Sequence, residues 1–228
     1  MARSDWGLLL LAFMLIGGGA GPARASDWSG AYLGANFGRA QNRYDTGSID
    51  REIMSEAASA FDTATFTARS IRDLSDAWWV NAGYFLNPYV GFDAAFFHLG
   101  ELKYEASGSL TGFSGDQSLD IKSELSSHGP AVSLVLRLPL TESFAVDLRV
   151  GDYYGKSTLD NLATVGANSN STRTSSSASS LLVGVGAACT IAGHWSIRLD
   201  YMRVNQTGDS QTGKFNVNLA SAGVSFTF

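Results

Sequence analysis

The stretch ASAGVSFTF, residues 220–228, ends the chain and alternates strictly between two kinds of side chain. One face carries small or polar residues, and the other carries apolar residues that finish on an aromatic ring: Ala220, Ala222, Val224, Phe226 and Phe228. Successive side chains of a β-strand point to opposite faces of the sheet. The stretch is therefore predicted to be a strand with one apolar face, and its pattern can be followed back through the chain.

Seven other segments repeat this period of two, at about residues 30–39, 78–86, 89–97, 130–140, 144–154, 180–191 and 194–202. Apolar residues occupy every second position, and the opposite face holds mainly Gly, Ala, Ser, Asn and a few charges. Together with the last segment they predict eight strands. The last strand breaks the rule in its upper half, because Phe215, Val217 and Leu219 have the opposite parity from Val224 and Phe228. A bulge or an aromatic position lining the interior is expected there.

The connections between the predicted strands alternate in length. Short links lie at Asn87-Pro88, Thr141-Glu142 and Ala192-Gly193, whereas the segments at about 40–76, 100–127, 155–180 and 205–214 are longer. Short turns on one side and long loops on the other are typical of outer-membrane barrels. The pattern predicts an all-β fold: an eight-stranded antiparallel up-and-down transmembrane β-barrel over residues 26–228. The four longer segments are expected to be external loops, with the turns and both termini in the periplasm.

Charged residues within the strands favour this interpretation over a secreted β-sandwich or a lipocalin-like barrel, in which the apolar face would be buried. A charge facing lipid near the membrane midplane costs about 2–4 kcal/mol. Six charges of both signs lie on the non-apolar face and are predicted to form a compensated network in the lumen: Asp93, Arg137, Asp147, Arg149, Arg198 and Asp200. They could instead form a proton or ion path. Because side chains nearly fill an eight-stranded lumen, a structural polar core is the favoured interpretation.

The first 25 residues have the layout of a secretory signal peptide. Arg3 precedes an apolar run from Leu8 to Ile16, and the small-x-small site Ala23-Arg24-Ala25 follows a glycine-rich stretch. The run is about half of the roughly 20 residues that a spanning helix needs. We therefore expect export across the inner membrane and cleavage before Ser26, not a transmembrane anchor.

The composition excludes several classes of function. Removing Arg3, Arg24 and Asp5 from the 16 basic and 21 acidic residues leaves 14 and 20, an acidic balance that argues against nucleic acid as a partner. A single cysteine, Cys189, excludes a disulfide framework and a cysteine-based zinc site. The loop carboxylates have no metal-loop spacing and are expected to be solvated: Asp116, Asp120 and Glu124. No cofactor and no metal site are predicted.

The three histidines are the candidates for catalysis. Neither His98 nor His128 begins an H-x-S sequence, whereas His194-Trp195-Ser196 has this spacing, which places a base and a hydroxyl on one strand face. The loop pattern puts His194 at the periplasmic end, away from the outer leaflet where a lipid deacylase works. The sequence therefore predicts a structural histidine at a turn and no catalytic residue.

The opening DWSGAYLGANFG, residues 27–38, resembles the W-[ST]-G-x-Y-x-G start of small proteobacterial outer-membrane barrels. With the eight alternating segments and the terminal Phe228, the chain resembles the OmpA/OmpX-like superfamily, in particular its alpha-proteobacterial porin-like surface-antigen branch. The resemblance implies location in the outer membrane of a Gram-negative bacterium, contact with lipid and lipopolysaccharide, and insertion by the barrel-assembly machinery. Phe228, Phe226 and Val224 would be the assembly signal. No peptidoglycan-binding domain is expected after residue 228.

The leading functional hypothesis is a non-enzymatic barrel that contributes to envelope integrity and presents loops for contact or adhesion, with a host or surface ligand as partner. A narrow porin for small solutes is the alternative. An enzyme that modifies lipid A is a third and weaker one.

Overall fold

The computed structural model describes residues 29–43, 63–112, 115–207 and 215–228, and every regular element in them is a strand. Among these residues no helix is long and apolar enough to cross a membrane. The strands are β1 (Gly30–Arg43), β2 (Thr63–Arg72), β3 (Leu74–Asn87), β4 (Val90–Gly112), β5 (Gly115–Pro139), β6 (Phe144–Val165), β7 (Asn168–Ala192), β8 (Trp195–Thr207) and β9 (Phe215–Thr227). The predicted signal peptide lies outside the described residues and stays a prediction.

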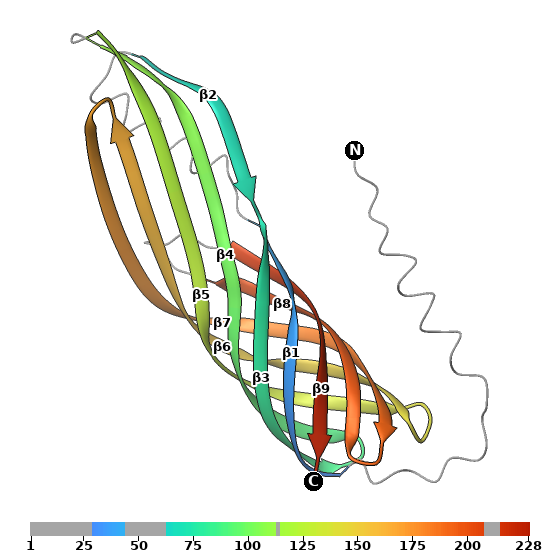
Figure 1. Cartoon of the computed structure of the whole chain (residues 1–228). Helices are drawn as coiled ribbons and strands as arrows, with labels where there is room; N and C mark the ends of the chain where they lie inside the picture. Colours follow the sequence, from blue (N-terminus) through green and yellow to red (C-terminus); the bar gives the residue numbers. More distant parts are fainter. Residues whose placement is uncertain (1–28, 44–62, 113–114, 208–214) are drawn as a thin grey trace.

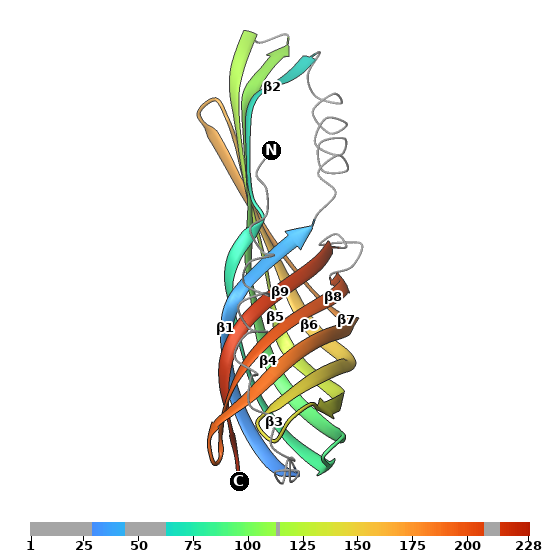
Figure 2. The same ribbon diagram turned by 90° about the vertical axis from the view of Figure 1, so that its right-hand side faces the viewer.

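Eight of the strands close into a ring. The order is β4-β3-β1-β9-β8-β7-β6-β5, and β5 pairs back with β4, every neighbour being antiparallel. Figure 2 shows β1, β9, β8, β7 and β6 crossing the barrel wall side by side at a tilt. The predicted eight-stranded barrel is confirmed, and β2 is an additional strand outside the ring.

The alternation of the sequence sorts side chains between the two surfaces of the wall. Odd positions of β1 and β8 and even positions of β3 and β9 point outward, where large apolar residues such as Leu33, Tyr84, Leu199 and Val224 are exposed. The positions between them point inward and are mostly buried. An exposed apolar band around a closed sheet is suited to lipid, because ring closure leaves no unpaired strand edge for hydrocarbon to face.

Tight turns close one end of the barrel. The side chain of Asn87 accepts the N–H groups of Tyr89 and Val90, each at 2.9 Å, between β3 and β4. The hydroxyl of Thr141 accepts the N–H of Phe144 at 3.0 Å before β6. These side chains replace the backbone partners that a reversing chain loses. Figure 1 shows the C-terminus at this same end.

The opposite end carries a projecting sheet that the sequence did not predict. Segments 100–127 and 155–180, expected to be loops, instead continue the strands as two long hairpins, β4–β5 and β6–β7. The strand β2 adds to this sheet by pairing with β4 between Lys103 and Thr111. The sheet β2-β4-β5-β6-β7 extends well beyond the ends of β1, β3, β8 and β9 (Figure 1). The loop prediction failed because these segments are polar, although Tyr104 and Ile121 still alternate onto one buried face.

A β-bulge at Gly100 separates the barrel part of β4 from its projecting part. The pairing with β5 shifts between His98 and Glu101, and Gly100 has φ +75°, a conformation that glycine adopts without a side-chain clash. Below the bulge the even positions, such as Phe96, point outward, whereas above it the odd positions, such as Lys103, do so. The extra residue therefore reverses which face each side chain of β4 occupies.

The last strand keeps one parity from end to end. It pairs with β1 without any register shift, from Asn216 to Thr227. Phe215, Val217 and Leu219 therefore point into the barrel and are buried, with relative exposures of 3% or less. Of the two expectations for this region, the interior lining position is confirmed and a bulge against β1 is absent. The register of β9 against β8 does shift, between Val204 and Thr207 of β8.

Candidate functional site

The candidate site is the polar interior of the barrel, built from inward positions of four strands. Each of its charged residues is at most 8% exposed. β4 contributes Asp93 and β5 contributes Arg137; β6 contributes Asp147 and Arg149; β8 contributes Arg198 and Asp200. The two charges of β6, and likewise the two of β8, are at positions i and i+2 and reach the interior together because a strand repeats every two residues. The structure thus brings together all six residues predicted for the lumen.

The six side chains form a chain of alternating charge. Arg137 binds Asp147 with two hydrogen bonds of 2.7 and 2.8 Å. Nη2 of Arg198 lies 3.1 Å from Oδ2 of Asp147 and 3.2 Å from Oδ1 of Asp200. Each cation is thereby held by a carboxylate, which lowers the cost of its burial.

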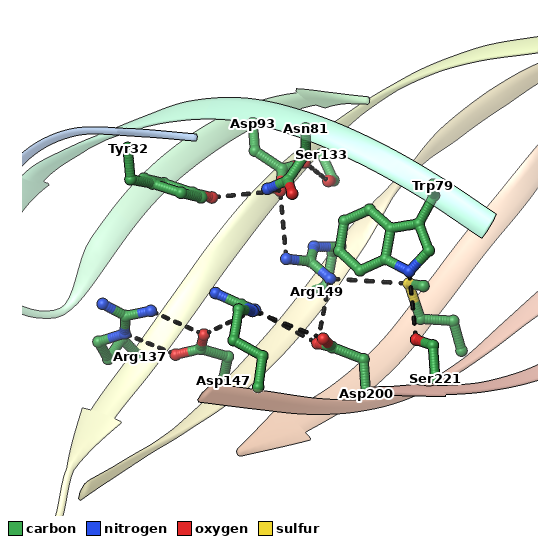
Figure 3. Close-up of polar contacts among 12 residues, drawn as sticks. Tyr32, Trp79, Asn81, Asp93, Ser133, Arg137, Asp147, Arg149, Asp200 and Ser221 are labelled. Atoms are coloured by element: carbon green, nitrogen blue, oxygen red, sulfur yellow. Dashed lines mark hydrogen bonds and ion pairs between the residues drawn. The ribbon is translucent and has the colours of Figure 1, made fainter. Parts of the chain in front are cut away.

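Arg149 completes this chain, as Figure 3 shows. Its Nη1 lies 3.4 Å from Oδ1 of Asp200. Its Nη2 lies 3.1 Å from Oδ2 of Asp93, an ion pair that lacks hydrogen-bond geometry. The order along the chain is Arg137, Asp147, Arg198, Asp200, Arg149, Asp93, with three charges of each sign. The formal charges of the network therefore cancel.

Asp93, at the end of the chain, is held by neutral donors as well. Its carboxylate accepts hydrogen bonds from the Tyr32 hydroxyl at 3.1 Å, from Nδ2 of Asn81 at 3.0 Å and from Oγ of Ser133 at 2.7 Å. These donors come from three different strands (Figure 3). Sequence reasoning missed them as site residues, although each lies at an inward parity of its strand. Neutral donors are common throughout the chain, so parity alone could not single them out.

An apolar layer covers the charge network on the side of the projecting sheet. Trp79 stacks on Phe97 with ring centroids 5.2 Å apart, and Phe97 meets Tyr153 edge-on at 6.1 Å. Each of these rings is at most 1% exposed. The layer continues through Leu99, Leu182, Met202, Val204, Phe215, Val217 and Leu219. Along β4, β6 and β8 these residues follow the charged ones in the direction of the projection, so they separate the network from that end.

Aromatic contacts join the charge network to the layers on both sides. The guanidinium of Arg149 lies 4.9 Å from the centre of the Trp79 ring. On the turn side, Arg137 lies 3.9 Å above the ring of Phe85, which stacks on Tyr32 at 5.3 Å. Cation–π contacts of this kind stabilise buried guanidinium groups. The interior is therefore a stack of three layers, with aromatic side chains on either side of the charges.

The three histidines lie outside the charge network of the interior. Nδ1 of His194 lies 2.7 Å from the carbonyl oxygen of Thr227, while the Ser196 hydroxyl pairs with Thr190 at 3.0 Å. The base and the hydroxyl of the H-x-S spacing thus have separate partners. His98 and His128 point outward from the barrel wall, where they contact aromatic rings.

The remaining candidates are dispersed. Glu124 pairs with Lys103 at 3.0 Å and Asp120 is exposed, whereas the side chain of Asp116 lies outside the described part of the chain. Cys189 is a free, partly exposed cysteine. Within the described residues, no three His, Cys, Asp or Glu side chains are grouped so that they could hold a metal ion.

The predicted assembly signal lies at the turn end. Phe226 contacts Phe228 edge-on at 5.1 Å and Trp195 at 5.0 Å, and the N–H of Phe228 donates to Ala31 at 2.9 Å. Val224 is exposed on the outer surface. Their role in assembly stays a prediction.

A closed antiparallel ring of eight strands, apolar outside and charged inside, defines a membrane-spanning β-barrel of the outer-membrane class. The family comparison gives the same result: the chain belongs to the OmpA-like transmembrane domain family, whose model matches residues 25–228. The protein accordingly lies in the outer membrane of a Gram-negative bacterium. Assignment to the alpha-proteobacterial branch stays a prediction.

The similarities to individual proteins are distant. No curated protein matches the sequence. Among solved structures, Neisserial surface protein A is 12% identical with a TM-score of 0.45, over 88% of this chain and 98% of that chain. Ail of Yersinia pestis, in complex with the heparin analogue sucrose octasulfate, is 12% identical with a TM-score of 0.44, over 87% and 99%. The outer-membrane protease OmpT of Escherichia coli is 11% identical with a TM-score of 0.42, over 92% and 99%.

Proposed function

We propose that this protein is a closed, non-enzymatic barrel that contributes to the integrity of the outer membrane and presents its projecting sheet outside the cell for contact with a surface or host ligand. The observation that carries the proposal is the filled interior. A chain of six paired charges and an apolar layer of buried rings lie in series across the lumen. An ion would have to break the charge pairs and also pass a layer packed mainly with buried apolar side chains, which is costly.

The orientation rests on the two unlike ends of the barrel. Tight turns and the C-terminus share one end, and the long hairpins share the other. Outer-membrane barrels have short periplasmic turns and longer extracellular segments. The projecting sheet is therefore assigned to the outside. Its outward side chains on β7 are serines together with Arg173, a polar surface suited to contact with water-soluble ligands.

The narrow porin is the alternative that this proposal rejects. The purified protein in planar lipid bilayers is expected to give no conductance above the lipid baseline, with a general diffusion porin reconstituted in parallel as the positive control. Sustained open steps that scale with the amount of inserted protein would contradict a closed lumen.

The lipid-modifying enzyme has less support, because the one H-x-S pair is divided between separate partners and lies at the turn end. Mass spectrometry of lipid A before and after expression of the protein tests this alternative. We expect an unchanged profile. A new lipid A species that depends on the protein would show that it is an enzyme.

A further inference from the structure

Four outward side chains form a continuous row on the barrel wall, where the wall meets the projecting sheet. Trp78 of β3 is the direct partner of His98 on β4, and His98 is the partner of His128 on β5. His128 in turn pairs with Lys156 on β6. Directly opposed residues on neighbouring strands have Cβ atoms about 4.5–5.5 Å apart, so the two imidazoles and the ammonium group of Lys156 lie side by side.

Aromatic rings hold the two imidazoles against the wall. His98 stacks on Trp78 with ring centroids 5.8 Å apart, and His128 lies 6.4 Å from the ring of Phe96. Both histidines are half-buried, whereas Lys156 is exposed. The rings restrict the imidazoles while leaving the end of the row open to a ligand that lies on the outer surface.

The row lies at the upper margin of the apolar band. One outward step closer to the turns, the same four strands carry Val80, Phe96, Pro130 and Tyr154. On the side of the projection, β4 and β5 carry charged side chains instead. The row thus marks the level at which the outer surface changes from lipid-facing to water-facing, where lipid headgroups lie.

The neighbouring carboxylates are engaged elsewhere. Glu101 and Glu124 bind Lys103 at 3.3 and 3.0 Å, and the hydrogen bonds that Lys103 donates to Glu124 and, second, to Glu101 raise the pKa of Lys103. Asp152, two outward steps below Lys156, accepts the Ser179 hydroxyl at 2.6 Å. Within the described part of the chain no ion pair to Lys156 is found. The row therefore offers hydrogen-bond donors and contains no carboxylate.

A groove on the same three strands begins two outward positions below the row, beyond Phe96, Pro130 and Tyr154. It has a volume of about 640 Å³ and lies on the outer surface of β4, β5 and β6, lined by Phe92, Ala94, Val132, Leu134, Val150 and Asp152. The exposed surface of its lining is almost entirely apolar. An apolar groove within the membrane band, beneath a row of cationic and N–H donors, matches an amphiphile with an anionic head.

We propose that the row His98–His128–Lys156 and the groove below it form a binding site for one membrane lipid with a phosphate-bearing headgroup. The Lys156 ammonium and the imidazole N–H groups donate to phosphate oxygens, and an acyl chain occupies the groove. The phosphate has two sources in this membrane, the phosphorylated sugars of lipid A and the phosphodiester of a glycerophospholipid. Charge-assisted hydrogen bonds to phosphate are among the strong ones in proteins.

The test uses the full-length barrel in neutral maltoside micelles, with bound lipid measured by native mass spectrometry. Lipid A, phosphatidylglycerol and uncharged diacylglycerol are the probes. We expect lipid A or phosphatidylglycerol to bind at least about tenfold more tightly than diacylglycerol. Whichever phospholipid displaces the other identifies the source of the phosphate. Equal binding of diacylglycerol and both phosphorylated lipids would overturn the proposal.

Variants locate the site on the barrel wall. The triple change His98→Gln, His128→Gln and Lys156→Gln is expected to weaken binding of the preferred lipid by about tenfold or more. Ala94→Trp, which fills the groove without changing any charge, is expected to weaken it as well. Arg203→Gln on β8 removes a cation from another part of the wall and is the matched control, with expected binding within about twofold of the parent.

Folding is checked by heat-modifiable migration on gels, so that lost binding is not mistaken for an unfolded barrel. If the triple change fails to fold, Lys156→Gln alone tests the row, since Lys156 is exposed and its removal disturbs no buried contact. Folded variants of the row and of the groove that bind the lipid as tightly as Arg203→Gln would refute the site.

Discussion

Arg198 shows what a charged side chain requires inside a narrow barrel. It is 1% exposed and lies between Asp147 and Asp200, about 3 Å from each. Removing a guanidinium from water costs several kcal/mol, and only close carboxylates offset this cost. Because Arg137 and Arg149 extend the same chain on either side, Arg198 holds the middle of the network.

Substitution of Arg198 by Leu tests this role. The change leaves three buried carboxylates facing two guanidinium groups, so the interior gains an uncompensated negative charge. We expect a loss of about 3–5 kcal/mol in the free energy of unfolding, the usual range for breaking a buried ion pair from one side. Urea unfolding in lipid vesicles, followed by tryptophan fluorescence, measures it.

The control for this experiment is Arg203→Leu, because Arg203 is exposed on the outer surface of the same strand. Its effect is expected to stay within about 0.5 kcal/mol. Equal losses for Arg198→Leu and Arg203→Leu would mean that the buried network adds no stability of its own.

At the scale of the elements, the hairpin β6–β7 has two parts with different tasks. From Phe144 to about Tyr154, β6 belongs to the ring and pairs with β5 and β7. Beyond it the hairpin projects, and Thr158 and Ser175 are direct partners that share a hydrogen bond of 3.1 Å. The ring closes without any residue of the projecting part.

Shortening this hairpin is therefore expected to leave the barrel intact. Residues 159–174 are replaced by Asn-Gly, a two-residue turn that suits a hairpin closed at Thr158 and Ser175. The shortened protein should migrate as a folded barrel, with a urea midpoint close to that of the parent. Failure to fold in vesicles would show that the projection is needed to form the ring.

The elements also show how far the sequence can be interpreted. Alternation in segments such as 144–154 predicted the ring strands, because lipid outside and a packed interior impose opposite requirements on successive residues. The same rule placed the six charges inside. The alternation rule did not predict the projecting strands. Their outer face lies in water, which accepts many kinds of residue, so the alternation there is weak. The apolar layer was not predicted either. The alternation rule already places Phe215, Val217 and Leu219 on the inward face, where the structure buries them.

At the scale of the whole molecule, ring and projection differ in their solvent and in their hydrogen bonding. Each ring strand is paired on both sides within a band that faces lipid. Near its tip, β7 pairs with β6, and its pairing with β8 begins only at Leu182. Strands that are paired on both sides within the membrane have high local stability. Amide hydrogens of an open sheet in water exchange more readily.

Hydrogen exchange in lipid nanodiscs is expected to divide the chain accordingly. Peptides from the ring parts of β6 and β7, such as 144–154 and 182–192, should exchange at least about tenfold more slowly than peptides from 158–175. Mass spectrometry of the exchanged peptides measures the difference. Uniform protection along both strands would contradict a ring and a projection of unequal stability.

The bulge at Gly100 also bears on how such a protein can change over generations. Below the bulge β4 presents apolar residues to lipid, and above it β4 presents polar residues to water. One inserted residue causes this change. Beyond it, an insertion or deletion of two residues in each arm of the hairpin preserves which face is buried, while a change of one residue inverts that face. The projection is therefore free to lengthen or shorten among descendants in steps of two residues per strand, while the ring below Gly100 keeps a constant length.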